Sequence, residues 1–538
     1  MPDLSEGFVS RHDNRHVHVQ GIADRAGTRA LSKRRQLLGL ESSDSWQDGM
    51  RGRRTLENGL GRTPPMGWSS WNAEGVNITE QEIRHAADAL VATGLRDAGY
   101  IYVNLDDGWA GWERDANGDL TVDEASFPSG IRSLADYIHS KGLKFGIYSS
   151  AGPKACSGRL GSLLHEDQDA RWFADHGVDF LKYDSCDDGK SGLGVKERFV
   201  RMRDALAKLS RPIYFAMGYW NEDTACAAGP VGNSWRTFFD IYSDVNRVFL
   251  TADKNNEYAA CQGPHFGWND ADALQIGRLS VKPGGDPDLE AERTQMTLWS
   301  IMKSPLIIGY DPSQMGSKRL AILKNREVIA INQDPLGKQA TKRFNSSDWD
   351  VWAGPLTGGR VVVALVNRNR DAVQQILVDW RTVGLESDAR MTARDVWRGA
   401  NLPGTHATNM GPFPVAPHGT VLLILSPVQS PWSSFWTWEP FGGGFVTPWI
   451  IAVGLALVSL VGFSVFFGTK RFRGWAAQGP SGGAGAGYKR SSSDSKGERV
   501  PLHERPERES PIRTQRSGLK REASTRISRS RTGDFDAV

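Results

Sequence analysis

Eight short apolar runs, separated by segments with helical periodicity, constrain the fold of this 538-residue chain more than any other feature. The runs are 64–71, 101–109, 144–150, 180–186, 213–220, 234–241, 265–274 and 305–311. Several begin with apolar residues and end in Asp, Asn, Ser or Trp, as buried parallel strands with polar carboxyl ends do. Between the first two runs, Thr79 and Glu82 make a T-x-x-E capping box before a helical pattern. The alternation predicts an α/β fold, a (β/α)8 TIM barrel over residues 61–337.

The pattern changes after the last of these runs. From 338 to 427 the hydrophobic period is two, in short segments such as RVVVALVNR and TVLLILS that are separated by turn residues. Alternation of this kind is typical of antiparallel strands with one buried face. We therefore predict a C-terminal antiparallel β-sandwich domain that packs on the barrel.

Residues 446–468 are 23 residues without a charge, which is long enough to cross a hydrocarbon core of about 30 Å. Aromatic residues in the linker 428–445 precede the run, and Lys470, Arg471 and Arg473 follow it. This arrangement predicts one transmembrane helix with a cytoplasmic C-terminal tail and the catalytic body on the extracellular or lumenal side. Residues 1–60 are predicted to be disordered and contain no apolar run of signal-peptide length, which is at odds with that orientation.

The formal net charge of +3 hides a division along the chain. The tail 469–538 carries +8 and is disordered by composition, residues 1–60 carry +2, and the middle of the chain carries −7. A mildly acidic body gives no reason to expect a nucleic-acid partner. The sequence gives no basis for predicting an oligomeric state.

Two carboxylates at strand ends are candidates for catalysis. Lys182, Asp184 and Cys186 share one face of an extended strand, and a neighbouring lysine favours the ionised carboxylate that a nucleophile needs. If the sixth strand is regular, Arg236 and Asp240 also share a face, and the apolar neighbours of Asp240 would raise its pKa, as a general acid requires. Each pair, taken alone, is equally compatible with a structural ion pair.

Further carboxylates and tryptophans gather at the same predicted rim. Asp106 and Asp107 end the second run beside a tryptophan, and Asp270 and Asp272 end the seventh beside another. Carboxylates hydrogen-bond hydroxyl pairs and indole rings stack on the apolar face of a pyranose, so this set indicates a sugar site. The eleven His residues form no HxxxH or HxH pattern there, and neither GxGxxG after a strand nor a P-loop is present. We expect no transition metal and no cofactor, and leave a structural Ca²⁺ open.

These motifs, taken together, resemble those of glycoside hydrolase family 27, the α-galactosidase or melibiase family. The resemblance extends from about residue 60 to 427 through RTPPMGWSSWN, LDDGW, GVDFLKYDSC, GNSWRTFFDI, GWNDADAL and VIAINQDPLGKQ. The GNSWR and DIYSDVNR segments look most like fungal members.

The resemblance implies a retaining exo-glycosidase that acts on terminal α-D-galactosyl residues. Asp184 matches the family nucleophile and Asp240 the acid/base. The positions that match the sugar pocket are Trp68, Asp106, Asp107, Tyr148, Lys182, Arg236 and Asp272, together with Tyr219 beside the sugar 2-position. Cys156 and Cys186 match a family disulfide. The retaining geometry predicts carboxyl groups about 5–5.5 Å apart.

The chain departs from the family pattern at the pocket. Gly108 stands where the family has one half of a second disulfide, and Gly218 where it has a further cysteine. With the family partner lost, whether Cys226 and Cys261 pair is left open. Tyr219 replaces a polar residue, and Ala273 replaces a usual methionine. These changes keep α-N-acetylgalactosaminidase and β-L-arabinopyranosidase activities open as alternatives, as well as a membrane-held galactose-binding protein without catalysis.

Overall fold

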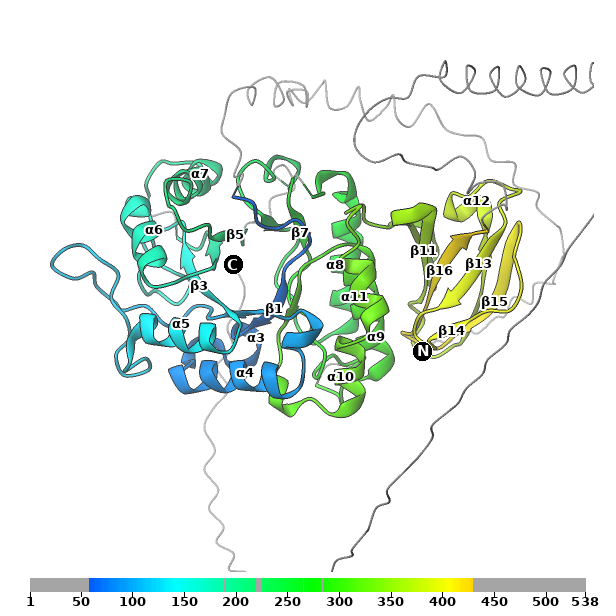
Figure 1. The fold of residues 1–538 in the computed structure, drawn as a ribbon, viewed down its shortest axis with the longest axis horizontal. Coiled ribbons are helices and arrows are strands. Elements are labelled where there is room, and N and C mark those ends of the chain that lie inside the picture. Colours follow the sequence, from blue (N-terminus) through cyan, green and yellow to red (C-terminus); the bar gives the residue numbers. More distant parts are fainter. Residues whose placement is uncertain (1–57, 188–189, 219–224, 265, 283, 429–538) are drawn as a thin grey trace, which may run out of the picture. The chain divides into compact units, whose positions relative to one another are not determined.

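The computed structural model describes residues 58–428 apart from 188–189, 219–224, 265 and 283, and its first part is a curled parallel sheet of eight strands (Figure 1). The strands are β1 (Met66–Ser69), β2 (Tyr102–Asn104), β3 (Lys144–Ser150), β4 (Phe180–Asp184), β5 (Tyr214–Met217), β6 (Ser234–Arg236), β7 (Trp268–Asp270) and β8 (Leu306–Ile308). Neighbours follow the order β7-β6-β5-β4-β3-β2-β1-β8. A parallel bridge between Leu274 and Ile308 joins the segment after β7 to β8. Each predicted apolar run contains one of these strands.

Helices connect the strands and cover the outside of the sheet (Figure 1). They are α3 (Trp71–Glu74), α4 (Glu80–Ala92), α5 (Gly130–Ser140), α6 (Glu166–Asp175), α7 (Val195–Leu206), α8 (Val245–Glu257), α9 (Leu289–Ile301), α10 (Ser317–Leu323) and α11 (Arg326–Asn332). The predicted capping box at α4 is confirmed: the Thr79 amide donates to Glu82 Oε2 at 2.7 Å, and the Glu82 amide donates to Thr79 Oγ1. Such a cap is worth about 1 kcal/mol of helix stability.

The second part is antiparallel, as the change of period predicts. Its strands are β9 (Thr341–Asn345), β10 (Trp349–Leu356), β11 (Arg360–Asn367), β12 (Gln374–Asp379), β13 (Met391–Asp395), β14 (Ala400–Asn401), β15 (Asn409–Val415) and β16 (Thr420–Pro427), with the short helix α12 (Trp380–Val383) after β12. Six strands form one sheet in the order β14-β13-β16-β11-β10-β9, and β12 pairs with β15. Buried side chains between the two sheets include Ile376, Trp380 and Leu423.

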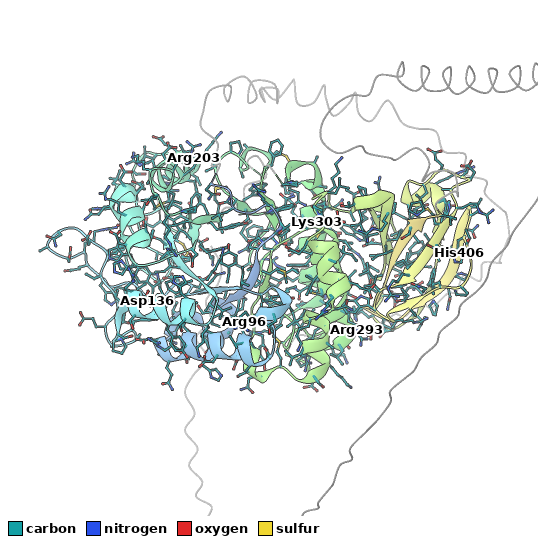
Figure 2. The ribbon with its side chains drawn as sticks, viewed as in Figure 1. Arg96, Asp136, Arg203, Arg293, Lys303 and His406 are labelled. Atoms are coloured by element: carbon teal, nitrogen blue, oxygen red, sulfur yellow. A yellow bond between two sulfur atoms is a disulfide. The ribbon has the colours of Figure 1, made fainter. Side chains whose placement is uncertain are left out.

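Helix α9 joins the two parts through its side chains. Ten of its residues are buried, since one side packs on the barrel and the other on β11 and β16. Thr294 Oγ1 donates to the His418 carbonyl at 2.7 Å, and Trp397 Nε1 donates to Thr297 Oγ1 at 2.9 Å. The side chains in Figure 2 fill the interior on both sides of this helix, and Lys303, just after it, is 1% exposed.

The predicted terminal segments lie almost entirely outside the described residues. These are the N-terminal extension to residue 57, the linker and transmembrane segment between 429 and 468, and the tail 469–538. Among the described residues, none of the helices has the length and apolar character needed to span a bilayer. The predicted transmembrane helix stays a prediction.

Candidate functional site

A cavity of about 180 Å³ opens at the carboxyl ends of the parallel strands. Residues from all eight strands or from the segments that follow them line it, as the barrel architecture requires of an active site. The lining residues are Ser69, Trp71, Asn72, Asn104, Asp106, Asp107, Tyr148, Cys156, Phe180, Lys182, Asp184, Ala216, Met217, Gly218, Arg236, Asp240, Asp270, Asp272, Ala273 and Ile307. Both predicted catalytic carboxylates are among them.

Lys182, on β4, lies between two carboxylates. Its Nζ is 2.8 Å from Asp106 Oδ2 and 3.8 Å from Asp184 Oδ2. Asp106 is fixed in turn, because the Ser69 hydroxyl donates to Oδ2 and the Asp106 amide donates to Ser70 Oγ. The ammonium is therefore held by Asp106 and faces Asp184, where it stabilises a carboxylate anion.

Asp107 and Tyr148 shape the neighbouring wall, beside a disulfide. Both oxygens of Asp107 accept hydrogen bonds from Ser157, from its amide and its hydroxyl, each at 2.7 Å. Tyr148, on β3, is 2% exposed, and its hydroxyl lies 3.4 Å from Cys186 Sγ. The predicted bond between Cys156 and Cys186 is present, so the loops after β3 and β4 are tied together at the cavity.

Arg236, at the end of β6, links two further carboxylates. Its NH2 atom is 2.7 Å from Asp272 Oδ2 and 3.0 Å from Asp240 Oδ1. Asp272 also accepts the Ile241 amide at 2.8 Å and has a φ of 73°, a left-handed conformation that Asp tolerates better than most residues. The prediction that Asp240 shares a strand with Arg236 is wrong: β6 ends at Arg236, and Asp240 lies in the following loop with its side chain 76% exposed.

The pKa shifts of Asp184 and Asp240 have the opposite directions to those expected from the sequence. Burial raises the pKa of Asp184, and although Lys182 lowers it, the pKa stays above its ordinary value. Loss of water contact raises the pKa of Asp240, but the positive charges of Arg236 and Lys182 lower it by more, so it lies below its ordinary value. The sequence shows both the apolar neighbours of Asp240 and its spacing from Arg236, but not which of the two has the larger effect on the pKa.

Trp68, which was predicted to contact the sugar, is not among the residues that line this cavity, and its sugar contact stays a prediction. Trp68 is 1% exposed within the barrel core, and its Nε1 donates to the Tyr310 carbonyl at 3.1 Å. The tryptophan that lines the cavity is Trp71, three residues later. Trp71 follows the end of β1, whereas Trp68 lies within the strand.

The cavity contains residues that the motifs did not single out. Ser69, Asn72, Asn104, Phe180, Ala216, Met217 and Ile307 all lie on the strands or immediately after them. Tyr219, the predicted residue near the sugar 2-position, lies outside the described residues. Its neighbour Gly218 does line the cavity: a Cβ there would lie 1.5 Å from Asp184 Oδ1, so the carboxylate occupies the space of a side chain at 218.

The cysteines leave no metal site at this wall. Within the described part of the chain, Cys156, Asp184 and Cys186 come close enough to share an ion. Both sulfurs belong to the disulfide, so neither offers the thiolate that a transition metal would take. Cys226 and Cys261, whose pairing the sequence left open, are also bonded to each other.

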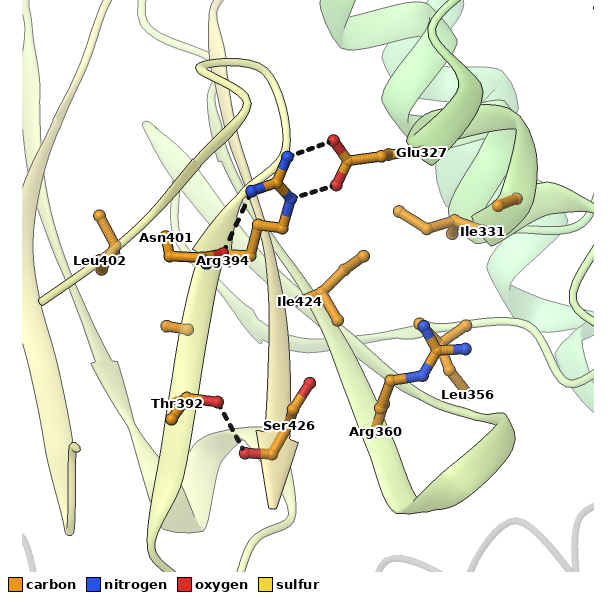
Figure 3. Close-up of a pocket in the computed structure, with 12 residues that line it drawn as sticks. Glu327, Ile331, Leu356, Arg360, Thr392, Arg394, Asn401, Leu402, Ile424 and Ser426 are labelled. Carbon is orange, nitrogen blue, oxygen red and sulfur yellow. Dashed lines mark hydrogen bonds and ion pairs between the residues drawn. The ribbon is translucent and has the colours of Figure 1, made fainter. Parts of the chain in front are cut away.

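A larger cavity, of about 420 Å³, lies between α11 and the C-terminal sheet (Figure 3). There the Arg394 guanidinium makes a two-pronged ion pair with Glu327 and also donates to Asn401. Arg394 lowers the pKa of Glu327 through this pair. Among the residues that line this cavity, Glu327 is the sole carboxylate, so it lacks the pair of acids that glycosidic bond cleavage uses.

Asp270 provides a pH-dependent test of the site. Burial raises its pKa to about 6, above the value of an unfolded chain, so the folded state binds the extra proton between about pH 4 and 6. The ionised group therefore costs stability above pH 6, and the cost disappears as the pH falls through this window. Asp270→Asn keeps the Oδ1 acceptor for the Asp272 amide. We expect it to raise the free energy of unfolding by about 1–3 kcal/mol at pH 7.5 and not at pH 4.

Urea denaturation at the two pH values measures this difference. Asp136→Asn, on the exposed side of α5, removes one carboxylate away from the cavity and serves as the matched control. A change in stability for Asp270→Asn that is the same at both pH values would contradict the assignment.

Comparison with known proteins identifies the family of this chain. The family model described as alpha galactosidase A matches residues 63–334, and the model described as alpha galactosidase C-terminal beta sandwich domain matches 346–425. The chain is 44% identical to an α-galactosidase of Oryza sativa over 384 residues, which cover 71% of this chain and 89% of the relative. It is 48% identical to an α-galactosidase of Coffea arabica over 347 residues, covering 64% of this chain and 89% of that one.

A solved structure gives the same result. The crystal structure of α-galactosidase I from Mortierella vinacea superposes with a TM-score of 0.65 and 34% identity, covering 70% of this chain and all of that one. The parallel eight-stranded sheet and the C-terminal sheets thus agree with both comparisons. The chain belongs to the α-galactosidase (melibiase) family and is a glycoside hydrolase.

Proposed function

We propose that this chain hydrolyses terminal α-D-galactosyl residues with retention, with Asp184 as nucleophile and Asp240 as acid/base. The observation that carries this proposal is that the two carboxylates line one cavity, each beside its own cation, and that the charge of Asp240 raises the pKa of Asp184. Two carboxyl groups with different environments are what a double displacement needs.

In the first step, an oxygen of Asp184 attacks the anomeric carbon and the bond to the leaving oxygen breaks. Asp240 gives its proton to that oxygen. A sugar in the cavity takes water away from Asp240, whose side chain is otherwise 76% exposed, and this raises its pKa towards the protonated form. Lys182 stabilises the anionic Asp184 before the attack.

In the second step, Asp240 takes a proton from water, the water oxygen bonds to the anomeric carbon, and the ester to Asp184 breaks. The negative charge of Asp184 raises the pKa of the acid/base while it is present, and it is absent in the ester. Asp240 is therefore the stronger acid at this stage and is present as the carboxylate that a general base must be. The cation Arg236, 3.0 Å away, favours the same form.

A panel of substrates tests the sugar. Ala273 lines the cavity, and its small side chain leaves space in which a larger substituent at the sugar 2-position could fit. The larger acetamido sugar is therefore included in the panel. We expect nitrophenyl α-D-galactoside to be hydrolysed faster than the matching α-N-acetylgalactosaminide and β-L-arabinopyranoside. NMR of the first product should show α-galactose before mutarotation. Faster turnover of either alternative would correct the sugar, and β-galactose as first product would refute retention.

We also propose that the chain is a fungal-type member held in a membrane through 446–468, with the body extracellular or lumenal and the tail cytoplasmic. The uncharged run, the basic residues after it and the GNSWR and DIYSDVNR segments support this. The full chain should stay in the membrane pellet after alkaline carbonate extraction. Leu457→Arg combined with Leu460→Arg should release it, because each arginine costs about 2.5–3.5 kcal/mol at a membrane centre. Wild-type protein in the supernatant would refute the anchor.

A further inference from the structure

Three aromatic side chains surround an arginine in the loop after β6 and at the start of α8. We name Phe238, Phe239 and Tyr242, together with Arg247, the aromatic rim. Phe239 is 47% exposed and Tyr242 is 56% exposed, while Phe238 is half-buried. The Arg247 Cζ lies 4.8, 5.8 and 5.1 Å from the ring centroids of Phe238, Phe239 and Tyr242. A cation at these distances is attracted to the faces of the rings.

The aromatic rim is fixed to the proposed acid/base. Arg247 Nε and NH2 both donate to the backbone carbonyl of Asp240, at 2.9 and 2.8 Å. Phe239 precedes Asp240 in the chain, and Tyr242 follows it by two residues. The rings therefore belong to the same hydrogen-bonded segment as Asp240, which lines the cavity.

The position of Asp240 determines where a leaving group must lie. Its carboxyl has to reach the oxygen of the bond that breaks, and its side chain lines the cavity on one side and is open to solvent on the other. A galactosyl ring on the closed side would leave the remainder of the substrate to extend outward, past the loop that carries the aromatic rim. Exposed aromatic rings close to a site indicate a contact surface.

We propose that Phe239 and Tyr242 form the binding platform for the first sugar of the leaving group, a specificity that rests on the function proposed above. A pyranose presents an apolar C–H face to aromatic rings and hydroxyl groups to the nearby arginine. A purely alkyl leaving group would leave the cation Arg247 without a polar partner on the ligand. The platform therefore favours oligosaccharides over alkyl galactosides.

Partition of the galactosyl-enzyme isolates this contact from the chemistry. With α-galactosyl fluoride as donor, the ester to Asp184 is attacked either by water or by a hydroxyl of added glucose. In both cases the ester bond breaks, the attacking oxygen bonds to the anomeric carbon and its proton goes to Asp240. Only transfer to glucose requires a sugar on the aromatic rim. Phe239→Ala and Tyr242→Ala should each lower the ratio of transfer to hydrolysis about tenfold. The rate at which water attacks the galactosyl-enzyme formed from the fluoride should be unchanged.

Phe344→Ala is the matched control. Phe344 is 41% exposed and stacks on Trp349 in the C-terminal sheet, with ring centroids 4.3 Å apart. The variant therefore removes an exposed phenyl ring at a position distant in sequence from the aromatic rim. It should change neither quantity. Phe239→Tyr should restore the partition ratio, because a ring of nearly the same shape returns. For wild type, kcat/KM with melibiose should exceed that of the Phe239→Ala variant by a similar factor.

Three results would overturn the proposal. The first is an unchanged partition ratio, or no transfer to glucose by the wild type. The second is an equal fall in transfer and hydrolysis, which would mean that the rings only position Asp240. The third is loss of transfer to 1-octanol without loss of transfer to glucose, which would assign the rim to an alkyl chain. A wild-type chain that releases no fluoride would refute the function itself, whereas these three leave it standing.

Discussion

Replacing Asp184 with asparagine is expected to lower kcat for nitrophenyl α-galactoside by about 10⁴-fold or more, because the amide cannot form the glycosyl ester. The fold should persist. Lys182 loses one carboxylate partner at 3.8 Å but keeps Asp106 at 2.8 Å, so no buried cation is left uncompensated. Thermal unfolding of the variant should therefore occur close to the wild-type temperature, and progress curves with the nitrophenyl substrate measure the loss of turnover.

Azide identifies the role of Asp184. In Asp184→Ala, azide can enter the space of the carboxylate and displace the leaving group once, which gives β-galactosyl azide. Asp107, another carboxylate at the cavity, offers a matched control. Its oxygens accept hydrogen bonds from Ser157, and Asp107→Asn keeps one of the two acceptor oxygens. Asp107→Asn should weaken substrate binding without azide rescue. Turnover of Asp184→Asn near the wild-type rate would refute the assignment.

Replacing Asp240 with alanine is expected to lower kcat/KM for melibiose by about 10²–10⁴-fold, the usual contribution of general acid catalysis. The loss should be much smaller for α-galactosyl fluoride, whose leaving group needs no proton. Hydrolysis of the ester then becomes slow, because no base activates water, and a covalent galactosyl-enzyme should accumulate. Mass spectrometry of the intact protein would detect the added galactosyl mass.

Azide should also restore turnover in Asp240→Ala, but with the other product. It replaces water in the second step, so two inversions give α-galactosyl azide. Asp244→Asn is the control from the same loop: it removes a carboxylate but keeps the acceptor for the Asn246 amide that caps α8. We expect near wild-type kinetics from it. Equal losses for melibiose and the fluoride in Asp240→Ala would contradict the role of acid/base.

Much of the site follows from strand ends alone. In a parallel barrel all strands bring their carboxyl ends to one rim, so a residue at or just after a predicted strand is placed without knowledge of packing. Lys182 and Asp184 were placed correctly because β4 is regular, and Asp106 and Asp107 because they lie within three residues of the end of β2. The C-terminal sheets were visible in their period-two pattern.

The rest depends on where strands end and which way side chains turn. β6 is only three residues long, so the alternation of side chains along a strand cannot be used to place Asp240, which lies in the following loop. Its carboxylate is held near the cavity by an ion pair with Arg236. Trp68 and Trp71 are close to the same strand end, and only the end of β1 at Ser69 places Trp68 within the strand and Trp71 after it, where Trp71 lines the cavity. The pKa directions depend on burial and on charges from β4 and β6, which adjacency in the chain does not give.

The absence of a side chain at Gly218 couples the substitutions that positions 184 and 218 can accept. Because the carboxylate of Asp184 occupies the volume of a Cβ at 218, the side chain that the family pattern has there cannot return while Asp184 keeps this rotamer. Any side chain at 218 therefore requires Asp184 to adopt another rotamer, so a change at either position alters which substitutions the other accepts.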